Sequence, residues 1–294
     1  MSALIAPLLA GWLGAACVGC AEFPPGEDWQ GYERTALSLG KMRMERAPEG
    51  LPVSHQALAD NFRRITFGIE ADVLEAGDAA LAEAGRLRRW ERPVRYHVVS
   101  LGTQRRVHAE MVHSVMGRLT RATGHDVALT GAGEPANLRV MFLRPQDYLP
   151  AAEFLRERAG APWLARQVER FGRMIDMPCV GIFLYAQAEA MGRPDEITFA
   201  LALIRAGLPP RLGRACVEEE LAQAMGLPND HPHVRPSVFN DDQEFALLTH
   251  HDEALLEILY DDRLHVGMTE AEAMELVPEI IDGMDTRALS GRAH

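Results

Sequence analysis

Positive charge is in short supply in this chain. Its 30 Lys and Arg residues face 42 Asp and Glu residues, so the formal net charge is -12 over 294 residues. Binding to nucleic acid or to an anionic membrane depends on clustered Lys and Arg, so we expect no nucleic-acid partner. One short arginine-rich run is typical of a solvated face and does not change this expectation; it comprises Arg86, Arg88, Arg89, Arg92 and Arg95.

Long apolar runs are absent beyond the N-terminus, so no later segment is expected to cross a bilayer. Residues 1–20 (MSALIAPLLAGWLGAACVGC) are apolar and rich in small residues, but they are too short for a comfortable transmembrane helix. Polar sequence with prolines follows at once. This pattern predicts an export signal, although no Lys or Arg precedes the apolar run.

The end of this segment, Val18-Gly19-Cys20, resembles the lipobox of bacterial lipoproteins, in which the cysteine becomes the lipidated first residue. We expect Cys20 to carry a lipid that holds the protein at the periplasmic face of a bacterial membrane. Ala21 is not the Asp associated with inner-membrane retention, which favours the outer membrane. Cys17 stands where the lipobox usually has Leu, so two alternatives stay open. These are ordinary signal-peptide cleavage near Ala21, which gives a soluble periplasmic protein, and an uncleaved N-terminal anchor.

Cysteine is scarce, with four residues in the whole chain. If the chain is exported, Cys17 leaves with the signal and Cys20 takes the lipid, so Cys179 and Cys216 remain as a lone pair in an oxidising compartment. We therefore expect a disulfide that joins the start of a strand to the start of the central helix. Two buried free thiols are the alternative if the protein is cytosolic.

The length and the 47% hydrophobic content are enough for one large core. We predict a signal at 1–20, an irregular leader with several prolines at 21–53, and a single domain at 54–294. Apolar spacing predicts helices that start near Ser54 and, capped by Thr103, near residue 103, with further helices over 151–174, 247–259 and 269–283. Strands are predicted over 94–100, 137–143, 179–185 and 197–204. The last two are nearly continuous apolar runs, which predicts burial on both faces.

Histidine is missing from the stretch around which the chain is organised, Cys216 to Leu227 (CVEEELAQAMGL). In zinc proteases, a His-Glu-x-x-His helix binds the metal through its histidines while the Glu acts on the metal-bound water. Glu219 and Gln223 occupy the two histidine positions here, and Glu220 occupies the catalytic position. Short motifs often match by chance, however, and acidic residues also favour the first turns of a helix through its macrodipole.

Residues after this helix stand at the spacings at which zincins, the zinc-protease fold group, place a turn and a third metal ligand. Gly226 falls where one branch of the zincins turns the chain. Asn229, next to Asp230, falls where those enzymes have their third ligand. The stretch after it contains further polar groups for a cleft, namely Arg235, Asn240, Asp241 and Asp242. The order of elements and the helix outline predict an α+β, zincin-like fold, in which a mixed sheet backs a degenerate active-site helix and C-terminal helices follow.

Two runs carry a family resemblance, EEELAQAMGLPNDHPHVRPSVFNDDQEFALL and HDEALLEILYDDRLHVGMTEAEA. They resemble a bacterial family known as domain of unknown function 2927, whose members look like exported lipoproteins grouped with the zincin-like metallopeptidases. The resemblance covers most of the chain after about Asp60. It implies that Glu-Glu-x-x-Gln and cysteines matching Cys179 and Cys216 are family traits, and it brings no reaction with it.

The altered helix changes the expected metal chemistry. Zinc prefers imidazole and thiolate, and a neutral Gln amide is a poor substitute, so we expect no cofactor and no zinc. The oxygen atoms of Glu219, Gln223, Asn229 and Asp230 are better suited to calcium, magnesium or manganese. Glu220 is the one candidate for a catalytic general base.

Three interpretations follow. The leading one is a pseudoenzyme, a zincin-like cleft that serves as a binding or scaffolding domain for an envelope protein or a cell-wall component. The second is an unconventional metal-dependent hydrolase that uses oxygen ligands and Glu220 as its base. In the third, the Glu-Glu-x-x-Gln face is architectural, with Glu220 or Arg235 paired inside the fold.

Overall fold

The structure is a computed structural model that describes most of the chain. It describes residues 28–51, 53–68, 85–101, 103–131, 133–158, 160–186, 195–240 and 242–284. The predicted export signal with Cys20 and the predicted cleft residue Asp241 lie outside these ranges, so what was expected of them stays a prediction.

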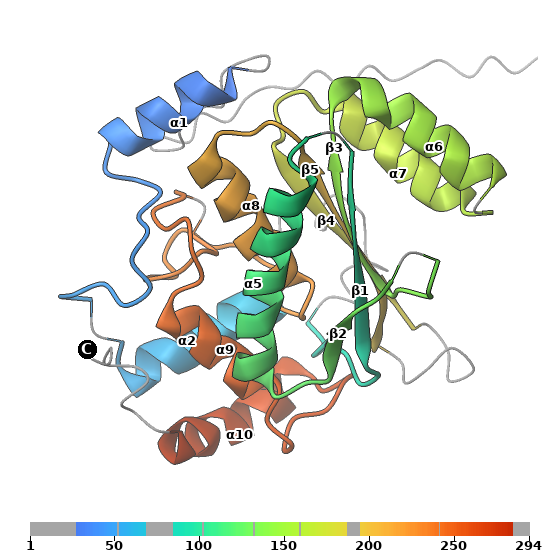
Figure 1. The fold of residues 1–294 in the computed structure, drawn as a ribbon. Helices are drawn as coiled ribbons and strands as arrows, with labels where there is room; N and C mark the ends of the chain where they lie inside the picture. The colour runs from blue at the N-terminus through green and yellow to red at the C-terminus, as the bar shows by residue number, and fades with distance from the viewer. Residues whose placement is uncertain are drawn as a thin grey trace, which may run out of the picture.

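A five-stranded sheet with helices on both faces organises the molecule (Figure 1). Its strands are β1 (Val94–Ser100), β2 (Val127–Leu129), β3 (Leu138–Leu143), β4 (Cys179–Tyr185) and β5 (Ile197–Arg205). The spatial order is β2-β1-β3-β5-β4, in which the first four strands run parallel and β4 is an antiparallel edge strand. The mixed α/β architecture confirms the coarse fold class. The four predicted strands are found within a residue of their expected bounds, and only the short, partly exposed β2 was not predicted.

The helices of the described residues are α1 (Trp29–Ser38), α2 (His55–Phe67), α5 (Arg105–Thr123), α6 (Tyr148–Glu157), α7 (Pro162–Arg173), α8 (Pro210–Gln223), α9 (His250–Leu259) and α10 (Glu270–Gly283), with a short 3₁₀ turn, η1 (Pro145–Asp147), before α6. Ser54 caps α2 by accepting a hydrogen bond from the Ala57 N–H. Thr269 and Glu272 form the capping box that starts α10. The predicted helix over 151–174 is two helices, because the chain breaks before Pro162, which has no N–H to continue a helix.

Alternate side chains of the sheet enter two different apolar clusters. Val140 and Phe142 of β3 face a large cluster built with α2, α5, α8, α9 and α10, whereas Met141 and Leu143 face a smaller cluster under α6 and α7. Because β5 lies inside the sheet, it is buried on both faces as predicted. β4 is only half-buried, which corrects the prediction for that strand and follows from its place at the sheet edge.

The leader is not irregular throughout, which corrects the expectation for part of 21–53. Trp29, Tyr32 and Ala36 form an apolar stripe on α1 and are buried against Leu212 and Ala215 of α8. After α1, Met42 is fully buried, and its N–H donates to the Gln243 carbonyl at 2.8 Å. The sequence contained this helical spacing, but the prolines on either side obscured it.

The arginine-rich run is not a simple solvated face either. Arg89 is 8% exposed and donates to the carbonyl of Leu259 at 2.7 Å. The others each reach a partner at or near the surface, with Arg86 on the Gly267 carbonyl, Arg88 on Asp195, Arg92 on Glu196 and Arg95 on Asp126. These arginines fasten the segment before β1 to distant parts of the chain.

Candidate functional site

The central helix α8 starts earlier than predicted, at Pro210 rather than at Cys216. Its first turn has no acidic residue, and its N-cap Pro209 makes no side-chain hydrogen bond. Glu33 of α1 supplies the acceptor, since its Oε2 accepts from the N–H groups of Arg211 (2.9 Å) and Leu212 (2.8 Å). A carboxylate at this position satisfies otherwise unpaired N–H groups and complements the helix dipole. The leader thereby holds the start of α8.

The early start of α8 also rules out the helix macrodipole as the reason for three consecutive glutamates. Glu218, Glu219 and Glu220 lie beyond the first two turns of α8, so the macrodipole at its N-terminus does not account for them. Each of the three carboxylates faces different surroundings.

Glu218 is fully buried and accepts from Arg46 (2.7 and 3.1 Å) and from Arg214 (2.9 Å).

The predicted disulfide is present. Cys179, the first residue of β4, is bonded to Cys216 in α8, with 5.8 Å between the Cα atoms. The bond holds the central helix against the edge strand of the sheet. Disulfides of this kind are typical of compartments outside the cytosol.

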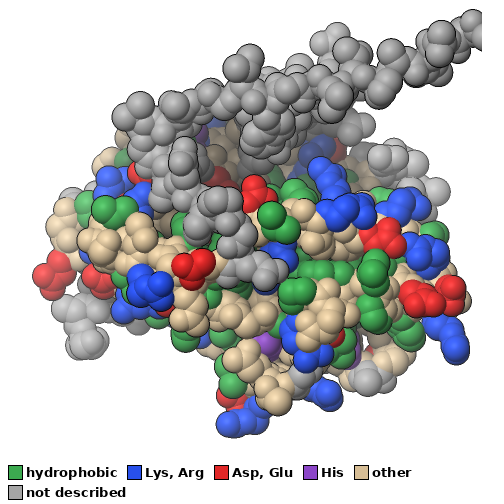
Figure 2. All heavy atoms as spheres, turned by 90° about the horizontal axis from the view of Figure 1, so that it is seen from above, with side chains coloured by type: hydrophobic (Ala, Val, Ile, Leu, Met, Phe, Trp, Pro, Cys, Tyr) green, Lys and Arg blue, Asp and Glu red, His purple; other side chains and the backbone are tan. Residues whose placement is uncertain are grey.

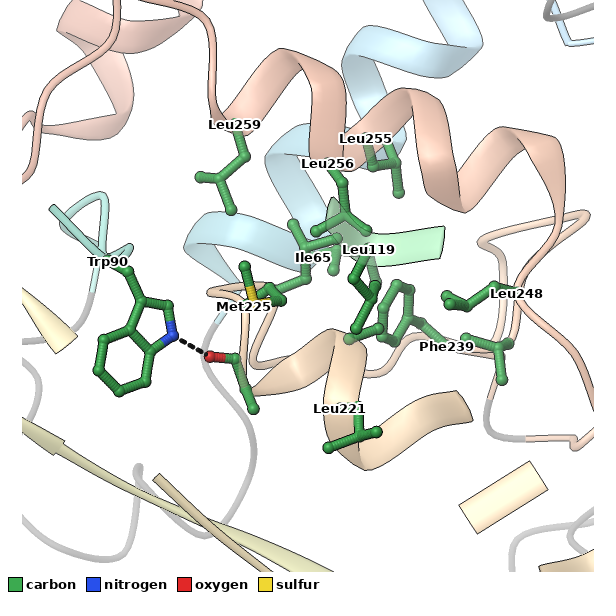
Figure 3. Close-up of a cluster of buried hydrophobic side chains, with 14 of the residues drawn as sticks. Ile65, Trp90, Leu119, Leu221, Met225, Phe239, Leu248, Leu255, Leu256 and Leu259 are labelled. Carbon is green, nitrogen blue, oxygen red and sulfur yellow. Dashed lines mark hydrogen bonds between the residues drawn. The ribbon is translucent and has the colours of Figure 1, made fainter. Parts of the chain in front are cut away.

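One face of α8 belongs to the core, as the sequence predicted. Val217, Leu221, Ala224 and Met225 are buried in the large apolar cluster. Figure 3 shows Leu221 and Met225 pointing toward side chains of α2, α5 and α9, while the indole N–H of Trp90 donates to the Ala224 carbonyl at 2.7 Å. This packing fixes which side chains of α8 are left to face elsewhere.

Gly226 ends the helix by a turn that other residues tolerate poorly. Its φ is +112°, and a Cβ atom there would come within 2.3 Å of the Arg88 carbonyl oxygen. Glycine is favoured in this backbone region and where two backbone segments come close. The turn expected from the spacing is therefore confirmed.

Glu219, at the first histidine position, is half-buried beneath the leader. Burial, and secondarily the Glu219 carboxylate, raises the pKa of Tyr32 in α1 to about 12. The Tyr32 hydroxyl donates a hydrogen bond to Oε1 of Gln243. Residues of α1 and of the 243 loop thus lie over the face of α8 on which a metal was considered.

Glu220, at the catalytic position, is 5% exposed and lies against the edge strand β4. Its Oε2 would be 2.7 Å from a Cβ atom placed on Gly181, so the carboxylate occupies the space that a side chain would need there. Gly181 is thus part of the same site, and its only signal in the sequence was its position as a glycine within an apolar strand. Such a glycine often marks a close approach.

Gln223 and Asp230 are the two candidate ligands that the fold brings together. The Gln223 amide donates to the Asp230 carboxylate at 3.3 and 3.4 Å. Asp230 also lines a pocket of about 240 Å³ beside the end of α2, together with Arg63, Arg64 and His231. Gln223 therefore has a partner inside the protein, and Asp230 has an opening next to it.

Asn229 does not join them. It is 8% exposed, and its side-chain amide donates to the Ile65 carbonyl at 2.8 Å. Its backbone N–H donates to the same carbonyl at 3.3 Å. Asn229 therefore ties the loop after α8 to the last turn of α2 through its N–H groups, and it also lines the pocket beside Asp230.

The polar stretch after Val234 divides between loop structure and surface. Asn240 is buried and donates to the carbonyls of Pro232 (2.9 Å) and Val234 (3.2 Å). Asp242 is exposed and lies 3.4 Å from the Lys41 ammonium. Arg235 is 54% exposed at its side chain and pairs with Glu244 at 2.7 Å. Arg235 is thus paired, but at the surface rather than inside the fold.

Two acidic side chains, Glu218 and Asp252, are completely buried. Asp252 at the start of α9 accepts from the Ser237 hydroxyl (2.5 Å) and from the N–H groups of Val238 (3.0 Å) and Thr249 (2.7 Å). Thr249 and Asp252 form a capping box, which was a readable signal. His251 next to it is buried and contacts Asn61, as expected of a core histidine.

The donor set does not fit a zincin zinc site. Glu219 is half-buried, Gln223 bonds Asp230, and the Asn229 side-chain N–H donates to the last turn of α2. Within the described ranges, no three His, Cys, Asp or Glu side chains are grouped closely enough to hold a metal ion. No chemical step through zinc can be built on this helix.

The comparisons with known proteins give one family. A family model described as a protein of unknown function, DUF2927, matches residues 55–279. No curated protein matches the chain, and no solved structure does. The matched region contains the sheet, the disulfide and the whole of α8. This chain belongs to the DUF2927 family.

Proposed function

We propose that this protein is an exported, lipid-anchored, zincin-like pseudoenzyme of the cell envelope, which binds or scaffolds a partner instead of cleaving one. The observation that carries the proposal is how the helix uses its three motif positions. Glu219 is half-buried and its charge acts on Tyr32 of the leader, Glu220 fits against Gly181, and Gln223 is bonded to Asp230. None of the three positions offers the histidine pair with which a zincin holds its metal.

The arrangement around α8 supports the zincin-like part of the proposal. A mixed sheet backs the helix, its antiparallel edge strand β4 runs beside it, and the Cys179–Cys216 bond joins the two. This is the layout expected from the order of elements in the sequence. The family resemblance, which groups members with zincin-like metallopeptidases, points in the same direction.

The disulfide also supports export, because cytosolic thiols are normally kept reduced. Among the described helices, none has both the length and the apolarity to cross a bilayer. We assign attachment to a membrane to the predicted lipid on Cys20.

The partner we propose is an envelope protein or a cell-wall component. The pocket beside Asp230 offers polar groups of both signs, with Arg63 and Arg64 on one element and Asp230 and His231 on the loop after α8. Such a mixture suits a peptide-like partner that carries both charged and amide groups. It lies beside the Gln223 end of the motif, because Asp230 both lines the pocket and accepts from Gln223.

The experiment compares wild-type protein with Glu220→Gln on protein and cell-wall substrates, after purification without chelator. We expect no hydrolysis above background from either form. Hydrolysis by the wild type that disappears in Glu220→Gln would refute the pseudoenzyme. Identical circular dichroism and melting curves for the two proteins establish that any difference comes from the carboxylate itself.

A metal-dependent hydrolase is the second candidate, and the contact between Gln223 and Asp230 favours it, because two of the four proposed oxygen ligands are adjacent. Calcium, magnesium or manganese suits such ligands. This candidate predicts about one metal ion per chain, lost in Glu219→Ala/Gln223→Ala. The matched control Glu275→Ala/Gln146→Ala removes the same groups from remote exposed positions. Wild-type protein that purifies without metal counts against the metal-dependent hydrolase.

A further inference from the structure

A separate pocket lies at the end of the sheet where β1, β3 and β5 finish. It measures about 120 Å³, and its walls include Val107, His108, Met111, Phe142, Ile204 and Leu208. In open α/β sheets, ligands bind outside the carboxyl ends of the parallel strands. Figure 1 shows α5 and α8 both starting at this end, and their N-cap residues Gln104 and Pro209 also line the pocket. None of the residues discussed above as catalytic or metal-binding belongs to it.

Two residues of the pocket lining have buried polar side chains, His108 and Arg205. The Arg205 guanidinium is used elsewhere, since it donates to the Met177 carbonyl at 2.8 Å and to the Tyr148 hydroxyl at 3.0 Å. His108 is 7% exposed and stacks on Phe142, with 3.9 Å between ring centroids. Its Nδ1 is hydrogen bonded to the Ser100 hydroxyl at 2.8 Å. In the part of the chain that the structure describes, no group bonds to its Nε2. Burial lowers the pKa of His108, so the ring is neutral and presents a polar nitrogen without a charge.

The start of α5 is unusual for a helix N-terminus. Thr103 was expected to cap it, but the N-cap is Gln104, which makes no side-chain hydrogen bond, and the first turn has no acidic residue. Two exposed arginines, Arg105 and Arg106, stand there instead, outside the pocket lining, and Arg106 pairs with Glu110 at 2.9 Å. Free N–H groups together with basic side chains favour an anion. At the neighbouring start of α8, the Glu33 carboxylate already fills the equivalent place.

We propose that this pocket binds a short branched aliphatic carboxylate. Its aliphatic group lies among Phe142, Ile204 and Leu208, and its carboxylate accepts from the N–H groups that begin α5. A cavity of about 150 Å³ holds a benzene molecule, so one slightly smaller takes an aliphatic group of about four carbons. The same chemistry occurs in a free acid and in a peptide that ends in leucine.

The surroundings suit a small amphiphile of this kind. Val107 at the pocket is 50% exposed, and Leu101, which directly follows β1, is 40% exposed. Figure 2, which views the molecule from this end, shows hydrophobic side chains and Lys or Arg side chains interspersed on the surface. An aliphatic carboxylate matches both kinds of group.

The test is calorimetric titration of the exported full-length protein with isovalerate, isovaleramide and acetate. We expect saturable binding of isovalerate, about fiftyfold weaker binding of acetate at about fourfold per missing carbon, and at least about fivefold weaker binding of the uncharged amide. Val107→Trp narrows the pocket and should weaken isovalerate about tenfold or more. Leu149→Trp, at an exposed position on α6, should bind like the wild type.

Two further arms complete the design. A pentapeptide that ends in leucine is compared with its C-terminally amidated form, and tighter binding of the free acid form than of isovalerate assigns the source to a peptide terminus. Binding of isovalerate alone assigns it to a free acid, and both results support the pocket. Absence of saturable isovalerate binding, equal affinity for the amide, or unchanged affinity in Val107→Trp overturns the proposal. These outcomes do not depend on Glu220 or on metal, so they are independent of the proposed function.

Discussion

Arg46 and Glu218 form a doubly hydrogen-bonded ion pair that joins the leader to the middle of the central helix. The two guanidinium nitrogens lie 2.7 and 3.1 Å from the carboxylate oxygens, and the Glu218 side chain is fully buried. Arg46 also donates to the Leu248 carbonyl at 2.7 Å, while the Leu248 N–H donates to Glu218 at 3.2 Å. A segment that precedes the matched family region is therefore built into the packing of α8.

Arg46→Ala should destabilise the protein by about 3 kcal/mol, because removing one partner leaves a buried carboxylate less compensated. Arg214 remains near Glu218, which keeps the loss at the lower end of the range for such pairs. Urea unfolding measures the change. The control is Arg43→Ala, whose partners include the exposed Glu45 and which should cost less than about 1 kcal/mol. Equal effects from the two variants would contradict the structural role given to Arg46.

Removal of the disulfide by Cys179→Ala/Cys216→Ala should cost about 3 to 4 kcal/mol, since the two residues are 37 apart in sequence and the bond restricts the unfolded chain. Thermal and urea unfolding of oxidised and double-variant protein give the difference. Mass spectrometry of an unreduced digest should find the peptides containing Cys179 and Cys216 linked. Recovery of both as free thiols would show that the pairing does not form.

Gly226→Ala should destabilise the fold by about 2 kcal/mol or more, because the new Cβ would meet the Arg88 carbonyl and the backbone has a positive φ. Gly283→Ala is the matched control. No atom lies within 4 Å of a Cβ there, and the residue ends a helix, so we expect no loss of stability. Comparable melting temperatures for the two variants would disprove the close contact at Gly226.

Tyr32 gives the protein a pH dependence in the alkaline range. Its pKa is raised from 10.0 to about 12, so the folded state holds the phenol proton more tightly than the unfolded state does. The resulting stabilisation is fully present below pH 10 and is lost as pH rises through about 12. Tyr32→Phe should therefore flatten the fall of unfolding free energy across this window.

Phenolate absorbance tests directly how the Glu219 carboxylate affects the pKa of Tyr32. Glu219→Gln should lower the pKa of Tyr32 toward 10.0 without restoring it fully, because burial is the larger cause and the carboxylate the smaller one. Difference titrations against Tyr32→Phe isolate this tyrosine from the others. An unchanged pKa of Tyr32 in Glu219→Gln would place the leader away from the first motif position.

Patterns among neighbouring residues predicted most of the secondary structure. The apolar runs over 179–185 and 197–204 became β4 and β5, and the Thr269 and Glu272 pair starts α10, because caps and strand runs are properties of neighbouring residues. The disulfide followed from cysteine scarcity. The candidate site was harder, since four motif residues at suitable spacing do not say which will find partners within the chain.

The contacts that decide those partners are distant in sequence. Tyr32 donates to Gln243, Arg46 pairs with Glu218, and Asn229 donates to the end of α2. No periodicity within α8 indicates that an arginine or a tyrosine from the leader will cover it. The same holds for Glu33, which caps α8 from another helix in place of a residue adjacent to Pro209.

The sequence by itself determined the mixed α+β class, the strands other than β2, the central helix with its Glu-Glu-x-x-Gln outline, the turn at Gly226 and the Cys179–Cys216 pair. Only the tertiary structure decided that Gln223 bonds Asp230 while the Asn229 amide donates to Ile65, and that the leader packs across α8. The reason is physical. Helix periodicity, caps and turns arise from interactions over a few residues, whereas the partner of a buried carboxylate or amide depends on which distant segment the closed core brings beside it.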